Sequence, residues 1–232
     1  MIVVRTVAEM TPTPAGPDDA DPAISPSLMR IQAAALRLFA AQGTSRTSLR
    51  AIAAAAEVSL GLVQHYFATK ADLISAVDAH VLELVAGVMA QPIPAPPADS
   101  LVAIGCRITA FLTEQPEVVD YLVDALVSGR ALGNVVFDAL AARCADRWQE
   151  LGDLGLTRPD LDPLWAPLNP LVLALGALML RPHLDRHLPQ PFTTPAQIHR
   201  WNESVIALLR RGALRNSGSG GASAENPGGS TP

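Results

Sequence analysis

The stretch that decides the fold is VSLGLVQHYFATKADL, at residues 58–73. Ser59 can cap a short helix at its start, because a serine side chain accepts a hydrogen bond from a free backbone amide of the first turn. Val63 and Phe67, four residues apart, would then share the inner face of that helix. Thr69 can cap a second, much longer helix. The stretch therefore predicts a short helix with one buried and one free face, followed by a long one.

Two more helices are predicted upstream. Apolar residues recur at three- and four-residue steps from Leu28 to Phe39, which predicts a helix that ends near Gly43. Thr47 or Ser48 can cap the next, short helix. The two short helices are joined by a tight turn and form a helix-turn-helix, whose second helix is the right size to enter a DNA major groove. We call this second helix, residues 59–66, the reader helix.

The outward side chains of the reader helix suit base edges. Gln64 can present a donor and an acceptor to adenine, and Leu60 or Leu62 can contact a thymine methyl group. The segment 27–75 has a net charge of +3 within a protein of net charge −5, which favours an anionic partner. The alternative is that these residues are the ordinary surface of a small helical bundle.

The compound pattern resembles the DNA-binding domain of the TetR family of regulators. The resemblance covers about residues 27–77 and includes TSLRAIA at 47–53 together with the stretch at 58–73. It implies an all-α fold with an N-terminal three-helix helix-turn-helix domain and a C-terminal helical domain that binds an effector and forms a homodimer. Gln64 stands where the family often has tyrosine, and Leu62 where it often has a small polar residue, so the operator preference of a relative does not transfer.

The resemblance also implies roles for individual residues. Thr47 and Ser48 would hold a phosphate at the N-terminus of the short helix that precedes the reader helix. Lys70 with Tyr66 would hold a phosphate on the other side. The remaining DNA-binding candidates lie on the reader helix: Ser59, Leu60, Gly61, Leu62, Gln64 and His65. Gly61 fits independently, because a residue without Cβ lets the backbone approach DNA closely. The alternative for His65 is a neutral side chain that fills a gap between helices.

Proline placement sets the expected domain boundaries. Long proline-free, alanine-rich runs can form continuous helices, whereas proline removes an amide donor and clashes with the preceding turn. The proline-rich start and the Gly- and Ser-rich end have few apolar side chains to offset the entropy of ordering. We expect a disordered arm at 1–26, the helix-turn-helix domain at 27–75, the effector and dimerisation domain at 76–215, and a disordered tail at 216–232.

Downstream of Pro97 the apolar spacing predicts one helix after another. Asn169 and Thr194 each precede a proline and suggest N-caps. The segment 171–180 is apolar on every side apart from Gly176, so it should be buried on several sides. The final helix carries a single apolar stripe, formed by Ile198, Trp201, Val205, Leu208 and Leu209. We favour a dimer interface over packing within one protomer for both, and two reader helices about 34–36 Å apart would meet successive major grooves of a palindromic operator.

The candidate residues for an effector pocket are aromatic. Aromatic residues that could line a largely apolar pocket are Phe111, Tyr121, Phe137, Trp148 and Trp165. The alternative is that each simply packs in the core. The expected mechanism is a population shift in which a lipophilic effector releases a repressor from DNA. Activation in place of repression stays open, as does a small-molecule-binding or interaction protein with a vestigial DNA reader.

No enzyme signature is found. The chain has no nucleophile elbow and no phosphate-binding glycine loop, and Cys106 and Cys144 lack metal-site spacing. His183 and His187 are four residues apart and could share a helix face toward a metal, but prolines bracket them and the glutamate of a zinc protease is missing. We therefore expect no catalytic residues, no metal and no cofactor. The longest apolar stretch, 164–180, is broken by prolines, which favours a cytoplasmic protein without a membrane span.

Overall fold

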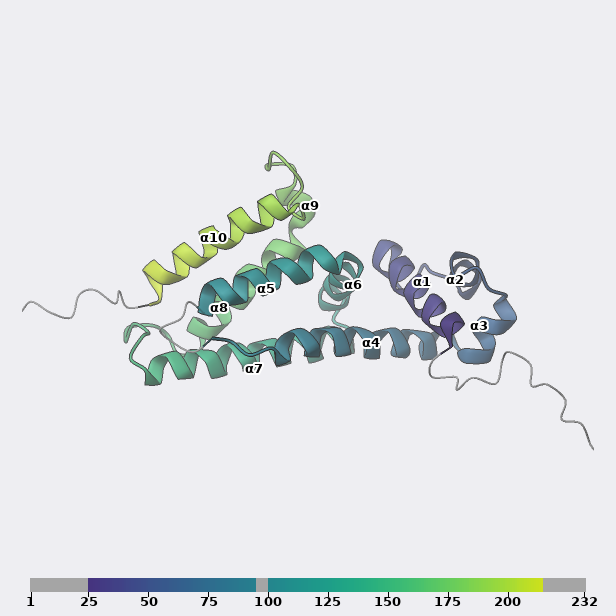
Figure 1. Cartoon of the computed structure of the whole chain (residues 1–232), viewed down its shortest axis with the longest axis horizontal. Helices are drawn as coiled ribbons and strands as arrows, with labels where there is room; N and C mark the ends of the chain where they lie inside the picture. The colour runs from purple at the N-terminus through teal and green to yellow at the C-terminus, as the bar shows by residue number, and fades with distance from the viewer. Residues whose placement is uncertain (1–24, 95–99, 215–232) are drawn as a thin grey trace, which may run out of the picture.

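The computed structural model describes residues 25–94 and 100–214. This part of the chain is a set of helices with a single isolated bridge between Thr157 and Leu214 and no strand, so the predicted all-α fold is confirmed (Figure 1). Of the predicted arm, only Ser25 and Pro26 are among the described residues. The predicted tail lies outside them. The helices are α1 (Pro26–Gln42), α2 (Leu49–Ala55), α3 (Leu60–Tyr66), α4 (Lys70–Ala90), α5 (Ser100–Glu114), α6 (Pro116–Val127), α7 (Ala131–Asp153), α8 (Trp165–Met179), α9 (Arg181–Leu184) and α10 (Pro195–Gly212).

The N-terminal helices begin and end where the sequence predicts. Gly43 follows α1 with a φ of 81°, a conformation that glycine adopts without strain. Ser48 and Ser59 cap α2 and α3, each accepting a backbone amide three residues on at 3.1 Å. Thr69 and Asp72 form a reciprocal capping box at the start of α4. These local hydrogen bonds fix the directions in which α3 and α4 leave the turn.

One core joins the helix-turn-helix to other described helices. Phe39 of α1 is fully buried and stacks on Tyr121 of α6, with ring centroids 6.1 Å apart. Val77 and Val81 of α4 belong to the same core, which continues to Val136 of α7. Figure 1 shows α4 reaching from α3 towards α7. A movement of α4 or α6 is therefore transmitted to α1, which packs against α2, and α2 packs against α3.

The C-terminal helices correct two sequence predictions. Helix α8 begins at Trp165 rather than after Asn169, because Oδ1 of Asp162 accepts the backbone amides of Leu164 and Trp165 at 2.9 Å and starts the helix there. Pro170 consequently lies inside α8. The predicted N-cap at Thr194 is confirmed, although its hydroxyl donates to the carbonyl of Pro191 instead of capping α10.

Helix α4 is the one described helix that is long and apolar enough to cross a membrane by length and composition alone. Helices α6 and α7 meet that criterion only as a pair, across a bend of 99°. The buried side chains of α4 lie on one face, at Leu73, Val77, Val81 and Val85. A single buried face in a shared core is the pattern of a core helix of a globular protein.

Gly133 lets α6 and α7 approach closely. A Cβ built on Gly133 would lie 2.5 Å from the carbonyl oxygen of Ala125, so the backbone of α6 would have to move. We expect Gly133→Ala to lower the free energy of unfolding by about 1–3 kcal/mol, as overpacking does. Gly87, whose Cβ would meet nothing within 4 Å, is the matched control, and Gly87→Ala should be neutral or stabilising. Urea unfolding of both variants measures the difference; equal stabilities would contradict the close contact.

Candidate nucleic-acid interface

Helix α3 presents a free face of the kind a reader helix needs. Val63 is fully buried and Phe67 nearly so, and both anchor α3 on the core, as predicted. Gly61, Gln64 and His65 are exposed on the other side. The Cβ of Gly61 would meet only the Ser59 hydroxyl, at 3.9 Å, so the backbone of α3 is open to a close approach there. This face can approach base edges without any rearrangement of the core.

The other predicted residues of the reader helix differ in exposure. Leu60 and Leu62 are half-buried, and Leu60 packs against the core, so its contribution to an outer surface is smaller than the sequence suggests. His65 is exposed, with its ring 5.5 Å from that of Tyr66 in an edge-on arrangement. It therefore does not fill a gap between helices, which was the structural alternative for this residue.

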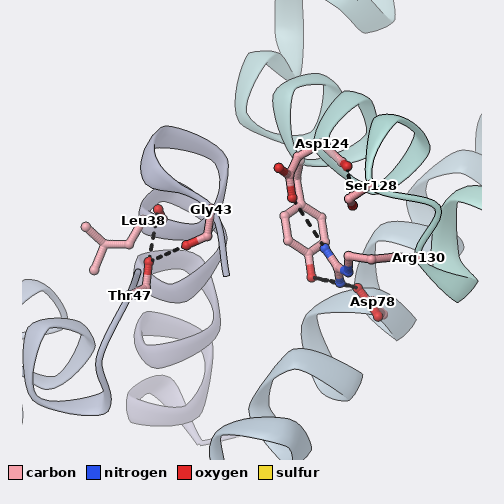
Figure 2. Close-up of polar contacts among 8 residues, drawn as sticks. Leu38, Gly43, Thr47, Asp78, Asp124, Ser128 and Arg130 are labelled. Atoms are coloured by element: carbon pink, nitrogen blue, oxygen red, sulfur yellow. Dashed lines mark hydrogen bonds and ion pairs between the residues drawn. The ribbon is translucent and has the colours of Figure 1, made fainter. Parts of the chain in front are cut away.

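Thr47 is placed differently from the sequence expectation. It is 2% exposed, and its Oγ1 lies 2.9 Å from the carbonyl oxygen of Gly43 and 3.4 Å from that of Leu38, as Figure 2 shows. Oγ1 also accepts a hydrogen bond from Nε2 of Gln42 at 3.2 Å. The hydroxyl of Thr47 thus joins the end of α1 to the start of α2 and has no free hydrogen for a phosphate. Ser48, which is exposed at the N-terminus of α2, remains available.

Tyr66 and Lys70 are both held by contacts within the domain. The hydroxyl of Tyr66 donates to Oγ of Ser25 at 2.8 Å, and Nζ of Lys70 donates to the carbonyl of Ser45 at 3.3 Å. The contact of Lys70 places its ammonium group beside the loop that precedes α2. A phosphate near Ser48 would find this positive charge close by, and the ammonium group keeps two further hydrogens to donate.

The positive charge of this domain is uncompensated by ion pairs. Among the described residues up to Val77, no ion pair within 4 Å is formed. Arg46 and Arg50 flank the N-terminus of α2 and are exposed. These two arginines contribute to the net charge of the segment but were not among the predicted site residues; their position within three residues of the Ser48 cap was the available signal. Together with the helix N-terminus they favour an anion.

A mainly apolar cavity of about 270 Å³ lies at the other end of α4. It is enclosed by α5, α7, α8 and α10 and by the last turn of α4. Of the five aromatic residues predicted to line an effector pocket, only Trp148 lies in the wall of this cavity. Most of the lining is aliphatic, from side chains such as Ile104, Leu140 and Val205, which have no pattern that distinguishes them from core residues.

The other four aromatic residues are used elsewhere. Tyr121 is fully buried in the core. Phe111 packs against that core and against a second, smaller apolar cluster of Leu112, Val119 and Ile198. Phe137 is half-buried, and Trp165 is 58% exposed at the start of α8. Trp201 of α10, predicted as part of the apolar stripe of the last helix, lines the cavity instead.

A polar cluster connects α4, α6 and α7 between the two sites. Nη2 of Arg130 lies 2.8 Å from Oδ1 of Asp78 and 2.7 Å from the Tyr121 hydroxyl, which itself donates to Oδ1 of Asp78 at 2.6 Å. The guanidinium group also lies over the Tyr121 ring, and Nη1 is 3.9 Å from Asp124. Figure 2 shows Asp78 of α4 and Asp124 of α6 converging on Arg130. The cluster holds three helices at fixed positions.

Burial, and secondarily the hydrogen bond to Asp78, raises the pKa of Tyr121 well above its ordinary value of about 10. Because the folded pKa is the higher one, this group stabilises the fold fully below pH 10, and its contribution is lost as the pH rises through the folded value. In Tyr66→Phe, where Tyr121 is the only tyrosine, we expect the tyrosinate absorbance to appear only when the chain unfolds in alkali. Ionisation of Tyr121 near pH 10 in the folded protein would contradict this.

His183 and His187 do not have the arrangement on one helix that the metal-site alternative requires. Helix α9 ends at Leu184, so the two histidines do not share a helix face. Within the ranges that the structure describes, no three His, Cys, Asp or Glu side chains gather where they could hold a metal ion. Burial raises the pKa of the Cys144 thiol, which keeps it protonated and makes it an apolar part of the cavity wall.

Residues 31–77 match the family model described as bacterial regulatory proteins, tetR family. The matched segment contains the helix-turn-helix and the start of α4. It is a TetR-family DNA-binding domain. The resemblance read from the sequence is thereby confirmed, and TetR-family proteins are transcriptional regulators, not enzymes. None of the curated proteins compared with the chain matches it significantly.

Solved structures share the fold beyond this domain. A TetR regulator from Chloroflexus aurantiacus has a TM-score of 0.66 at 21% identity, over 82% of this chain and 94% of that one. SmeT of Stenotrophomonas maltophilia, the repressor of a multidrug efflux pump, has a TM-score of 0.62 at 18% identity, over 82% and 91%. AibR, solved with isovaleryl coenzyme A and operator DNA, has a TM-score of 0.59 at 18% identity, over 78% and 97%. At these identities the likeness concerns the fold.

Proposed function

We propose that this TetR-type regulator is a cytoplasmic homodimer that represses transcription from a palindromic operator and is released by a small lipophilic effector. The observation that carries the proposal is the free face of α3, with Gly61, Gln64 and His65 exposed, together with Arg46, Arg50 and Lys70 around the N-terminus of α2. An outward helix face next to cations without ion pairs is suited to base edges flanked by phosphates.

An exposed apolar face on α8 supports the homodimer. The segment 171–180 was expected to be buried on several sides, yet Leu171 and Ala177 are buried while the opposite side of the helix is exposed. The exposed members of this α8 face are Leu164, Trp165, Val172, Leu173, Met179 and Leu180. Gly176 lies among them, and a Cβ there would meet nothing within 4 Å. A large apolar face with a small residue at its centre fits a second copy of the same helix.

The last helix extends this surface only in part. Ile198 of its apolar stripe is fully buried, and Trp201, Val205 and Leu209 line the cavity. Leu208 is 61% exposed and is the member of the stripe that remains for a partner. The dimer interface we propose is therefore centred on α8, with α10 contributing mainly through Leu208.

The cavity supports the effector response. It is mainly apolar, as small-molecule sites usually are, and its wall includes Val88 and Met89 at the end of α4. Helix α4 begins directly after α3, so a ligand that prefers one position of its last turn also selects a position of the reader helix. A precedent in a structural neighbour is AibR, which has been solved with both an acyl coenzyme A and operator DNA.

Genome-wide mapping of bound sites followed by gel-shift titration tests the proposal. We expect a palindromic site beside the bound genes and release of DNA by an effector. Failure of the full chain to shift any selected duplex at low salt would overturn the proposal and favour a small-molecule-binding protein with a vestigial reader. Transcription measured with and without the mapped operator separates repression from activation.

Two reader variants should lose DNA binding in different ways. Lys70→Ala should weaken binding to all sequences and reduce the salt slope by about one unit, because one phosphate contact is lost. Gln64→Ala should relax selectivity at one base pair, by about 1–3 kcal/mol if its contact is bidentate. Arg158→Ala, on an exposed residue outside the domain, is the control and should bind normally. Unchanged binding by both reader variants would contradict the assignment of α3.

A further inference from the structure

Three arginines converge on the last turn of α4 and on the segment that follows it. Nη1 and Nη2 of Arg107 donate to the carbonyls of Gln91 and Pro92 at 2.9 and 2.8 Å. Nη2 of Arg143 donates to the carbonyl of Met89 at 3.2 Å, and Nη2 of Arg147 to that of Pro94 at 3.2 Å. We call Arg107, Arg143 and Arg147 the arginine cluster. All three side chains line the cavity described above.

The charge of this cluster is poorly neutralised. Among the described residues, Arg107 and Arg143 form no ion pair, and Arg147 pairs only with Glu150, which is itself 62% exposed. Backbone carbonyls satisfy hydrogen-bond donors but cancel no charge. Nε of Arg147 is buried and has no hydrogen-bond partner. No Asp or Glu occurs among the described residues that line the cavity, so the cluster gives one end of an apolar cavity an excess positive charge.

We propose that the cavity binds an amphipathic anion, with its carboxylate or phosphate head on the arginine cluster and its apolar tail among the aliphatic side chains. This names the chemical class of the effector and rests on the proposed function of the cavity. Guanidinium groups present paired donors that match carboxylate and phosphate oxygens, and they carry a charge that a neutral ligand cannot use. A volume of about 270 Å³ lies near the lower end of small-molecule sites, which suits a short or medium acyl chain.

The same arginines connect ligand binding to the position of the C-terminal end of α4. Met89 and Gln91 lie at the C-terminal end of α4, whose last carbonyls lack intrahelical partners. An anion that takes the guanidinium hydrogens competes with these carbonyls, so the end of α4 is held differently with and without ligand. This gives the ligand the differential interaction with two conformers that a population shift requires.

Titration of the full chain with three probes of equal chain length tests the proposal. Decanoate, decyl phosphate and decanol share the tail and differ in the head, and the fluorescence of Trp148 and Trp201 in the cavity wall reports binding. We expect at least one of the two anions to bind about tenfold more tightly than decanol. Comparison of decanoate with decyl phosphate then identifies the head group. Decanol binding as tightly as both anions, or no binding of either anion, overturns the proposal.

Variants locate the head group. Arg107→Met and Arg143→Met should each weaken anion binding about tenfold and leave decanol binding unchanged, which also shows that the cavity is intact. Arg200→Met, on an exposed arginine of α10 that does not line the cavity, is the matched control and should bind like the wild type. Full anion affinity in both cluster variants overturns the proposal. DNA binding by the ligand-free protein is measured in parallel by gel shift. Loss of DNA binding in that assay would contradict the proposed function, but it would not contradict the proposed ligand class.

Discussion

Gly176→Glu is expected to produce a monomer that binds the operator at least a hundredfold more weakly than the wild type. The introduced carboxylate would lie in the middle of the exposed apolar α8 face, where two copies would bring like charges together in a desolvated contact. Simultaneous engagement of two half-sites raises affinity by about 10²–10⁴-fold, and a monomer loses that gain. Sedimentation velocity measures the assembly, and fluorescence anisotropy on labelled operator measures the affinity.

The protomer itself should tolerate the change. A Cβ at Gly176 meets no atom within 4 Å, so the helix has room for a side chain in the isolated chain. Gly87→Glu is the matched control, since Gly87 is an exposed helical glycine and, like Gly176, has open space where a Cβ would lie. It should remain dimeric and bind DNA normally. A dimeric Gly176→Glu variant, or a wild type that is monomeric at all concentrations, would contradict the α8 interface.

Arg130→Met is expected to lower the free energy of unfolding by about 2 kcal/mol. Removal of one partner of a buried ion pair leaves an uncompensated charge, which costs about 3–5 kcal/mol when burial is complete. The side chains of Arg130 and Asp78 are 20% and 25% exposed, so solvent reduces that cost. The Tyr121 hydroxyl also loses a partner. Urea denaturation gives the loss, and the slope of the transition should not change.

An exposed ion pair supplies the comparison for Arg130. Arg158 pairs with Asp160 at 2.8 Å on the surface, and Arg158→Met should leave stability unchanged within error. A double-mutant cycle adds Asp78→Ala to Arg130→Met; the combined loss should be smaller than the sum, because the two residues act on each other. Strict additivity would mean that the cluster is not energetically connected.

The DNA-binding end of the chain was predictable because local hydrogen bonds decide it. Ser48, Ser59 and Thr69 each cap a helix through a bond to an amide three residues away, and such bonds can be read from sequence spacing. The free face of α3 follows from the burial of Val63 and Phe67. Thr47 was misplaced for the converse reason: its partners belong to α1, and sequence spacing does not show that its side chain turns inward.

The end of the molecule that holds the cavity depends on contacts between distant segments. The cavity wall combines side chains of five helices. The arginine cluster donates hydrogen bonds to carbonyls up to 54 residues away in the chain. Aromatic content was therefore a poor guide to the lining, because Tyr121 serves the core and Trp165 lies on the surface. The start of α8 was missed because Asp162, not Asn169, supplies the cap, and a proline then lies within the helix.

The length of α4 converts a small change of angle into a displacement on the scale of a nucleotide. Its 21 residues form a rod about 31 Å long, with the arginine cluster at one end and α3 at the other. A pivot of about 5° at the far end would carry α3 sideways by about 3 Å over that rod, close to the 3.4 Å rise between base pairs. If a bound head group shifts the end of α4 as proposed, a pivot of this size would put a pair of reader helices out of step with the duplex.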